Sequence, residues 1–221
     1  MLNIIKGKLI VSCQALQDEP LHSSFIMGRM ANAAKIGGAV AIRAQGVDDI
    51  IEIKKVTGLP VIGIIKRDYD DSEIYITPTK KEVEELLQTK CEMIALDATD
   101  RVRPNEESLE DIIKYIKKNN VLVMADISTY EEAVNAQRLG CDCVSTTLCG
   151  YTSYSEKYEG PNLELLERLV KDLDIPVIAE GKINTPEDLK AVYEKGILSA
   201  VVGSAITRPQ LIAQKFAEAI I

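Results

Sequence analysis

The sequence predicts a single-domain (β/α)₈ barrel, or TIM barrel, an α/β fold in which eight parallel strands alternate with helices around a closed sheet. Three observations support this prediction. Short apolar runs recur along the chain, amphipathic segments separate them, and polar side chains follow the end of each run. The length of 221 residues suits one barrel domain that spans residues 1–221.

Eight continuously apolar runs are the candidate strands. They do not alternate polar with apolar residues, as expected of parallel strands that are covered on both faces. The runs lie at residues 8–13, 38–43, 60–66, 92–97, 121–126, 141–146, 175–180 and 198–203. An open, doubly wound sheet is the alternative, but eight units without an evident switch point favour closure.

The segments between these runs carry signals for helix ends. Thr79–Glu82 and Thr129–Glu132 have the spacing of capping boxes, and Thr185–Pro186 is typical of an N-cap followed by the first helical residue. Three glycines stand where a helix is expected to end in the left-handed conformation: Gly37, Gly140 and Gly196.

The bulk composition excludes several classes of protein. A formal net charge of −8 argues against binding to nucleic acid or to an anionic membrane. The five cysteines form no C-x-x-C pair and are expected to be buried, reduced thiols. The N-terminal apolar stretches are too short for a signal peptide or a membrane span, so a soluble, cytoplasmic protein is expected.

Polar residues at the strand ends mark the expected active site, because chemistry in this fold gathers at the carboxyl ends of the strands. Lys66 and Glu180 each follow an unbroken apolar run, where partial desolvation moves a pKa toward neutrality. We therefore predict that they form an acid–base pair. Other strand-end candidates are Gln14, Arg43, Gln45, Asp97, Asp126, Thr146 and Thr147, with Thr146 taken as a substrate contact and Asp97 as equally consistent with a structural role.

Two glycine turns predict a phosphate site. Gly181-Lys182 follows the seventh run, and Gly203-Ser204 follows the eighth, which are the usual phosphate loops of this fold. Backbone N–H groups can approach an anion closely at a glycine, and Arg208 can close on the phosphate oxygens.

Several other chemistries are not supported. His22 is the only histidine, which excludes a multi-histidine metal centre and argues against a Ser-His-Asp triad; in its polar loop it suits a cap or a substrate contact. No zinc spacing and no nucleotide-binding motif occurs, so we expect neither a metal nor a cofactor. The acidic run at residues 68–73 is expected to be a solvated loop rather than a cation site.

The motifs around these positions resemble the bacterial N-acetylmannosamine-6-phosphate 2-epimerases over nearly the whole chain. They are IVSCQALQDEPLHSSFIMGRMA, AIRAQG, GIIKRDY, ITPT, IALDAT, MADIST, GCDCVSTTLCGYT, IAEGKINTP and AVVGSAITRP. The resemblance implies a ribulose-phosphate-binding barrel that interconverts N-acetylmannosamine 6-phosphate and N-acetylglucosamine 6-phosphate in sialic acid catabolism. The family's usual GGAIT is here GSAIT, which keeps an anion-binding backbone.

The resemblance also assigns roles to individual residues. It implies that Lys66 and Glu180 are the catalytic pair. The implied substrate contacts are Gln14, Arg43 and Asp126, and the implied phosphate contacts are Gly203, Ser204 and Arg208.

Two other functions are compatible with this sequence. One is a different lyase or isomerase of the same barrel group, such as a sugar-phosphate decarboxylase, which would release carbon dioxide. The other is a sugar-phosphate sensor, which would bind its ligand without turnover.

The C-terminal helix PQLIAQKFAEAII ends in apolar residues. This end is consistent with a cap on the barrel base, but it favours packing against a second subunit in a homodimer.

Overall fold

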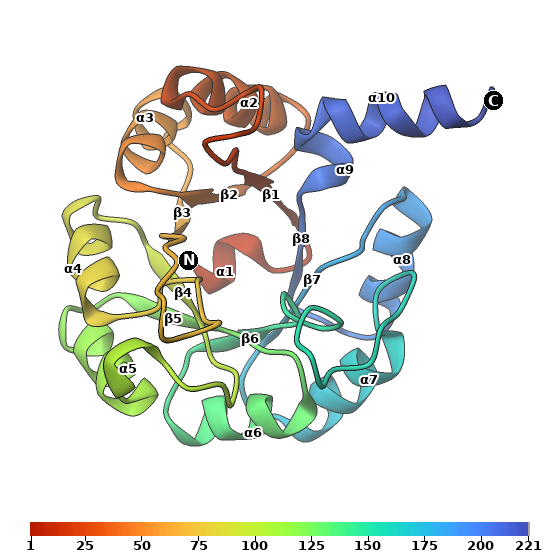
Figure 1. Ribbon diagram of the computed structural model, residues 1–221. Helices are drawn as coiled ribbons and strands as arrows, with labels where there is room; N and C mark the ends of the chain where they lie inside the picture. Colours follow the sequence, from red (N-terminus) through yellow and green to blue (C-terminus); the bar gives the residue numbers. More distant parts are fainter. Residues whose placement is uncertain (221) are drawn as a thin grey trace.

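The computed structural model describes residues 1–220 and contains a closed barrel of eight parallel strands (Figure 1). The strands are β1 (Leu9–Cys13), β2 (Ala41–Gln45), β3 (Val61–Ile64), β4 (Met93–Asp97), β5 (Leu122–Asp126), β6 (Cys143–Ser145), β7 (Val177–Glu180) and β8 (Ser199–Val202). Each strand pairs with the next, and β1 pairs with β8 from Leu9↔Ala200 to Val11↔Val202. The predicted TIM barrel is confirmed, and the alternative of an open sheet is wrong.

Helices surround the barrel on its outside, as Figure 1 shows. They are α2 (Ser24–Ile36), α3 (Val47–Thr57), α4 (Lys80–Gln88), α5 (Leu109–Lys118), α6 (Tyr130–Arg138), α7 (Leu163–Asp172) and α8 (Pro186–Glu194). The remaining elements are α1 (Leu2–Ile5), the 3₁₀ turn η1 (Pro104–Glu106), α9 (Ser204–Thr207) and α10 (Pro209–Glu218). No described helix is long and apolar enough to cross a membrane.

The predicted helix-start motifs are confirmed. Thr79 and Thr129 both form complete capping boxes with the glutamate three residues later. Thr185 caps α8, Pro186 is its first residue, and Asp188 completes a third capping box.

The glycine predictions are confirmed at two positions and wrong at the third. Gly140 and Gly196 have φ values of 88° and 82°, whereas Gly37 is right-handed with a φ of −73°. The left-handed residue after α2 is Gly38, with a φ of 107°. Because Gly37 and Gly38 are adjacent, the helix ends one residue later than predicted, and Gly38 rather than Gly37 takes the left-handed conformation that other residues avoid.

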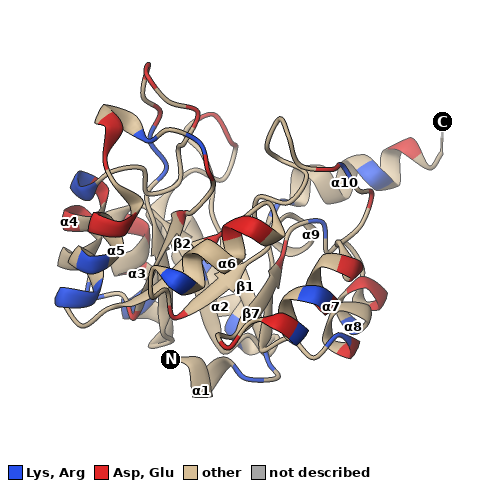
Figure 2. Ribbon diagram, turned by 90° about the horizontal axis from the view of Figure 1, so that it is seen from below, with Lys and Arg blue, Asp and Glu red and all other residues tan. Residues whose placement is uncertain are grey.

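The apolar core has two parts. One lies between the strands and the surrounding helices, and the other fills the barrel interior. The interior part includes Ile5 of α1, which is fully buried, so α1 closes the amino end of the barrel (Figures 1 and 2). The five cysteines are buried and free, as the sequence predicts: Cys13, Cys91, Cys141, Cys143 and Cys149.

Helix α10 extends away from the barrel at the end opposite α1 (Figures 1 and 2). None of its residues is buried, and Phe216 is 75% exposed. The apolar C-terminal segment noted in the sequence continues to Ile220, which is 88% exposed; Ile221 lies outside the described residues.

Candidate active site

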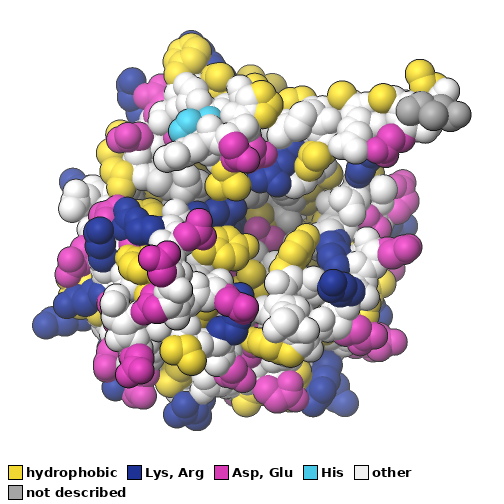
Figure 3. All heavy atoms as spheres, viewed as in Figure 1, with side chains coloured by type: hydrophobic (Ala, Val, Ile, Leu, Met, Phe, Trp, Pro, Cys, Tyr) yellow, Lys and Arg dark blue, Asp and Glu magenta, His cyan; other side chains and the backbone are white. Residues whose placement is uncertain are grey.

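A cavity of about 400 Å³ opens at the carboxyl ends of the strands. Figure 3 shows the surface hollowed near the centre of this end of the barrel. Most of the residues predicted for the site line it, namely Gln14, Arg43, Lys66, Glu180, Gly181, Lys182, Gly203, Ser204 and Arg208. Thr147 also lines it, whereas the strand-end candidates Gln45, Asp97, Asp126 and Thr146 are not in the cavity wall.

Arg43 at the end of β2 is the centre of a buried charge cluster. Its guanidinium, only 1% exposed, donates to both carboxylate oxygens of Asp126, with Nη1–Oδ1 and Nη2–Oδ2 distances of 2.9 and 2.5 Å. Nη1 also donates to Oε2 of Glu180 at 2.6 Å. A paired arginine–carboxylate contact fixes the plane of the guanidinium, so Asp126 supports Arg43 from beneath the cavity wall.

Thr147, not Thr146, brings its hydroxyl to this cluster. Oγ1 of Thr147 lies 2.7 Å from Oδ1 of Asp126 and 3.1 Å from Oε2 of Glu180. The hydroxyl of Thr146 instead bonds the backbone of Glu180, accepting its N–H at 3.1 Å and donating to its carbonyl at 2.9 Å. Thr146 therefore fixes β7 next to the cavity, and its contact with substrate stays a prediction.

Lys66 and Glu180 face the same cavity from opposite sides of the barrel, since β3 and β7 are four strands apart in the closed order. Burial, together with the nearby cations Arg43 and Arg208, lowers the pKa of Lys66 to about 8. Burial raises the pKa of Glu180 to about 6, against the opposing effect of Arg43. Both groups can therefore gain and lose protons near neutral pH.

The backbone of Lys66 is fixed by neighbouring residues, whereas its ammonium group has no hydrogen-bond acceptor among the described residues. Lys66 pairs with Ile76 in an isolated antiparallel bridge, and its N–H donates to Oε1 of Gln45 at 3.3 Å. Within residues 1–220, no acceptor hydrogen-bonds Nζ of Lys66. The amine is thus held at the cavity with its protons unshared.

Gln14 and Gly203 both lie next to Ser12 of β1. Nε2 of Gln14 donates to Oγ of Ser12 at 2.7 Å, and its Oε1 is buried without a partner among the described residues. A Cβ on Gly203 would lie 3.3 Å from Cβ of Ser12, so glycine allows this backbone to lie close to β1. An unpartnered amide oxygen in a cavity wall is available to a ligand hydroxyl or amide.

Arg208 and Lys182, the two cations predicted to contact the phosphate, have different surroundings. Nη1 of Arg208 lies 3.5 Å from Oγ of Ser204, beside Gly203. Lys182 lines the cavity, but its ammonium donates to the carbonyl of Tyr158 at 2.5 Å and lies 5.5 Å from the centre of the Tyr151 ring. Lys182 therefore holds the loop after β6 as well as facing the cavity.

Further lining residues were not predicted from the sequence, and three of them are Tyr75, Tyr151 and Asn184. All three lie in loops, where no periodic pattern reveals the orientation of a side chain. Burial raises the pKa of the Tyr75 phenol, with Asp126 and Asp97 acting in the same direction. A neutral hydroxyl at this position can donate to a substrate oxygen.

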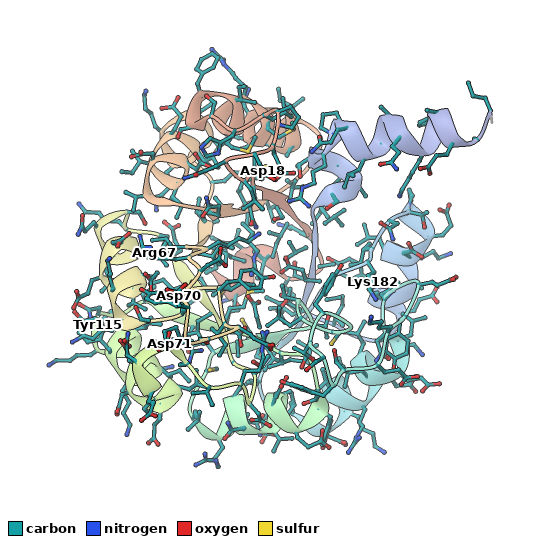
Figure 4. All side chains as sticks on the ribbon, viewed as in Figure 1. Asp18, Arg67, Asp70, Asp71, Tyr115 and Lys182 are labelled. Atoms are coloured by element: carbon teal, nitrogen blue, oxygen red, sulfur yellow. The ribbon has the colours of Figure 1, made fainter. Side chains whose placement is uncertain are left out.

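The remaining candidates lie apart from the cavity wall. Asp97 accepts from Thr99 and from Arg101, which is a structural role. His22 is exposed and contacts the carbonyl of Ala15. Figure 4 shows Asp70 and Asp71 of the acidic run on the other side of the view from Lys182, and the described residues contain no group suited to a metal ion.

The fold and this cavity place the chain among the TIM-barrel enzymes whose chemistry occurs at the carboxyl ends of the strands. The pattern of the family described as putative N-acetylmannosamine-6-phosphate epimerase matches residues 27–221. The chain belongs to this family.

Relatives support the same assignment over the full length. A putative N-acetylmannosamine-6-phosphate 2-epimerase of Clostridioides difficile (strain 630) is 74% identical over 220 residues, covering 100% of this chain and 99% of the relative. One from Clostridium perfringens (strain SM101) is 67% identical and covers 99% of both chains. The solved N-acetylmannosamine-6-phosphate 2-epimerase from Clostridium perfringens has a TM-score of 0.98 and 66% identity, covering 99% of this chain and 96% of its own.

Proposed function

We propose that this protein interconverts N-acetylmannosamine 6-phosphate and N-acetylglucosamine 6-phosphate by moving the proton at C2. One observation carries the proposal: Lys66 and Glu180 face one cavity with pKa values of about 8 and about 6, shifted toward each other from their ordinary values. The family membership and the resemblance of the motifs support this substrate. We propose that the reaction belongs to sialic acid catabolism and occurs in the cytoplasm.

Inversion at a carbon beside a carbonyl requires loss of one proton and return of another to the opposite face. In the open-chain sugar the aldehyde makes the C2 proton acidic, so no external electron sink is required. Neutral Lys66 takes the proton from C2 on one face, and Glu180 returns one on the other face or moves a proton at oxygen. The opposed positions of β3 and β7 suit such a two-base inversion.

Arg43 and Asp126 support the charges that develop. Arg43 stabilises negative charge on the enolate oxygen, since a fixed cation acts most strongly where charge appears in a water-poor site. Asp126 is fully buried and orients Arg43 through both carboxylate oxygens. A proton passed from Glu180 to Lys66 through the substrate leaves the net charge of the cluster unchanged.

The part of the cavity formed after the adjacent strands β7, β8 and β1 suits the phosphate and the sugar hydroxyls. Gly203 and Ser204 offer backbone N–H groups and a hydroxyl, Gly181 lies in the neighbouring loop, and Arg208 supplies the cation. Gln14 offers an unpartnered oxygen to a hydroxyl or to the N-acetyl N–H.

The test is to incubate the protein with N-acetylmannosamine 6-phosphate in D₂O and follow C2 by proton NMR. The product formed first is expected to carry deuterium at C2. Product that keeps its original C2 hydrogen would contradict proton return by a second group.

The matched variants are Lys66→Met and Lys118→Met. Lys118 is an exposed lysine at the end of α5, so its loss removes the same charge away from the cavity. We expect turnover to fall by about 10²-fold or more in K66M, because a positioned acid–base group typically contributes that much, and to be unchanged in K118M. Wild-type turnover in K66M would show that Lys66 is not the base.

A further inference from the structure

Glu19 lies in the loop between β1 and α2 and holds the guanidinium of Arg208. Oε1 of Glu19 lies 2.9 Å from Nε of Arg208, and Oε2 lies 3.0 Å from Nη2. Two parallel contacts of this kind fix both the position and the plane of a guanidinium. Both side chains are partly enclosed, at 16% and 28% exposure.

The carboxylate of Glu19 is itself held from two directions. Oε2 accepts the backbone N–H of Leu16 at 2.8 Å, and Oε1 accepts Nε2 of Gln210 at 3.2 Å. Leu16 belongs to the same loop, whereas Gln210 lies in the first turn of α10. Glu19 therefore joins the β1–α2 loop to the junction of α9 and α10, and its oxygens have little freedom to move.

The contact with Glu19 decides which edge of Arg208 remains free. Nε and one N–H of Nη2 point to the carboxylate, so Nη1 and the second N–H of Nη2 form the remaining edge. Nη1 lies 3.5 Å from Oγ of Ser204, and Arg208 lines the cavity beside Gly203. Phosphate oxygens can accept from this edge in the paired geometry that arginine favours.

We propose that Glu19 is a positioning residue, which presents the free edge of Arg208 to the phosphate of the substrate. This inference rests on the proposed function, since it takes Arg208 as the phosphate contact. An arginine without such support has to be ordered when the ligand binds, which lowers affinity. The negative charge of Glu19 opposes an anion, but four donors already share that charge, so the ordering of Arg208 dominates.

The first test compares Glu19→Gln with Asp18→Asn in steady-state kinetics with N-acetylmannosamine 6-phosphate. Asp18 is the neighbouring, exposed carboxylate of the same loop (Figure 4), and no hydrogen bond or ion pair joins its side chain to another residue within 1–220. We expect E19Q to raise KM about 10-fold or more, the loss typical of one charge-assisted contact, with kcat little changed. D18N should match the wild type.

A double-mutant cycle shows whether Glu19 acts through Arg208. In the Arg208→Ala background, E19Q should add no further rise in KM. Glu19→Asp keeps the charge on a shorter side chain and should give a KM between those of the wild type and E19Q. Circular dichroism melting of each variant checks that the fold is intact.

The outcomes separate the inference from the proposed function. If R208A raises KM and E19Q leaves it unchanged or lowers it, the positioning role of Glu19 is wrong and the phosphate role of Arg208 stands. An additive rise in the double variant also overturns the positioning role. If R208A leaves KM unchanged, the phosphate contact in the proposed function is wrong.

Discussion

Lys66 and Glu180 acquire neighbouring pKa values from one physical cause that acts in opposite directions. Burial disfavours the charged form of each, so the pKa of the lysine falls to about 8 and that of the glutamate rises to about 6. Arg43 contributes to both values: it acts with burial to lower the pKa of Lys66, and it limits the rise in the pKa of Glu180. A single buried arginine thus helps to adjust both members of the proposed pair.

The pH dependence of turnover follows from these two values. We expect kcat/KM to follow a bell-shaped curve, falling below pH about 6 and above pH about 8, because one group must carry a proton and the other must not. The measurement is the initial epimerisation rate across pH. The substrate phosphate also titrates near pH 6, so the basic limb is the diagnostic one. A rate that stays level to pH 10 would contradict the role of Lys66.

Lys66 should also make the folded protein less stable, because its ammonium is partly buried and no described residue accepts a hydrogen bond from it. The folded state binds fewer protons than the unfolded state between pH about 8 and 10.5, so stability rises with pH across that window. At pH 7 the penalty is on the order of 3 kcal/mol. Lys66→Met is therefore expected to melt several degrees higher than the wild type at pH 7.

This stability difference should narrow as the pH rises from 8 toward 10, since Lys66 loses its proton in the folded state first. Circular dichroism melts of K66M, K118M and the wild type over this range measure it. An equal or lower melting temperature for K66M at pH 7 would show that the buried ammonium costs no stability.

The sequence was sufficient to identify Lys66, Arg43 and Glu180 as site residues, but not to show which contacts each of them makes. Lys66, Arg43 and Glu180 end apolar runs, and that local signal is readable without coordinates. Thr146 and Thr147 could not be distinguished, because β6 ends at Ser145 and strand alternation no longer fixes which side chain turns inward. Glu19 was missed because its partner Arg208 is far along the chain and nothing local links them.

At the scale of elements, the capping boxes do more than start helices. Glu132 completes the box of α6, and its buried carboxylate also accepts the N–H of Asp100 at 3.2 Å and the hydroxyl of Tyr154 at 2.5 Å. These partners belong to the loops after β4 and β6. One carboxylate therefore ties α6 to two loops at the active-site end of the barrel.

The matched comparison is Glu132→Ala against Asp188→Ala. Both acids complete a capping box, but among residues 1–220 the carboxylate of Asp188 bonds only Asn184 and Thr185, and these bonds are solvent-exposed. We expect D188A to cost about 1 kcal/mol and E132A roughly 3 kcal/mol or more, because E132A leaves several buried donors unpaired. Urea denaturation measures both. Equal losses would show that the loop contacts of Glu132 add no stability.

Helix starts and strands could be predicted from the sequence where the pattern that marks them lies within a few neighbouring residues. A capping box lies within four residues, and each apolar run overlaps an observed strand. Strand ends were less accurate: β2 begins at Ala41 rather than residue 38, because the left-handed Gly38 places the first residues of that run in a turn. Exact ends depend on pairing with the neighbouring strand, which is not a local property.

At the scale of the whole molecule, α10 is the element least explained by a single chain. It extends from the barrel (Figure 1) with Leu211 and Phe216 exposed, and Ile206 of the adjoining helix α9 is 40% exposed. Apolar side chains gathered on one projecting segment are typical of an interface. We therefore keep the expectation of a homodimer, with α10 as part of its interface.

Phe216→Glu tests this expectation against Val134→Glu, which places the same charge on an exposed apolar residue of α6. We expect light scattering over a concentration series to give a dimer for the wild type and V134E, and a monomer for F216E, because a buried carboxylate destabilises an apolar interface. A monomeric wild type would rule out the homodimer.

The short helix α1 has a kinetic consequence. Since Ile5 and the interior core close the amino end of the barrel, the cavity communicates with solvent through the mouth at the carboxyl ends. Under the proposed function, both sugar phosphates use this entrance and bind in the same cavity, so they cannot be bound at once. Each should act as a competitive inhibitor of the other's conversion, so accumulating product slows the enzyme well before the reaction reaches equilibrium.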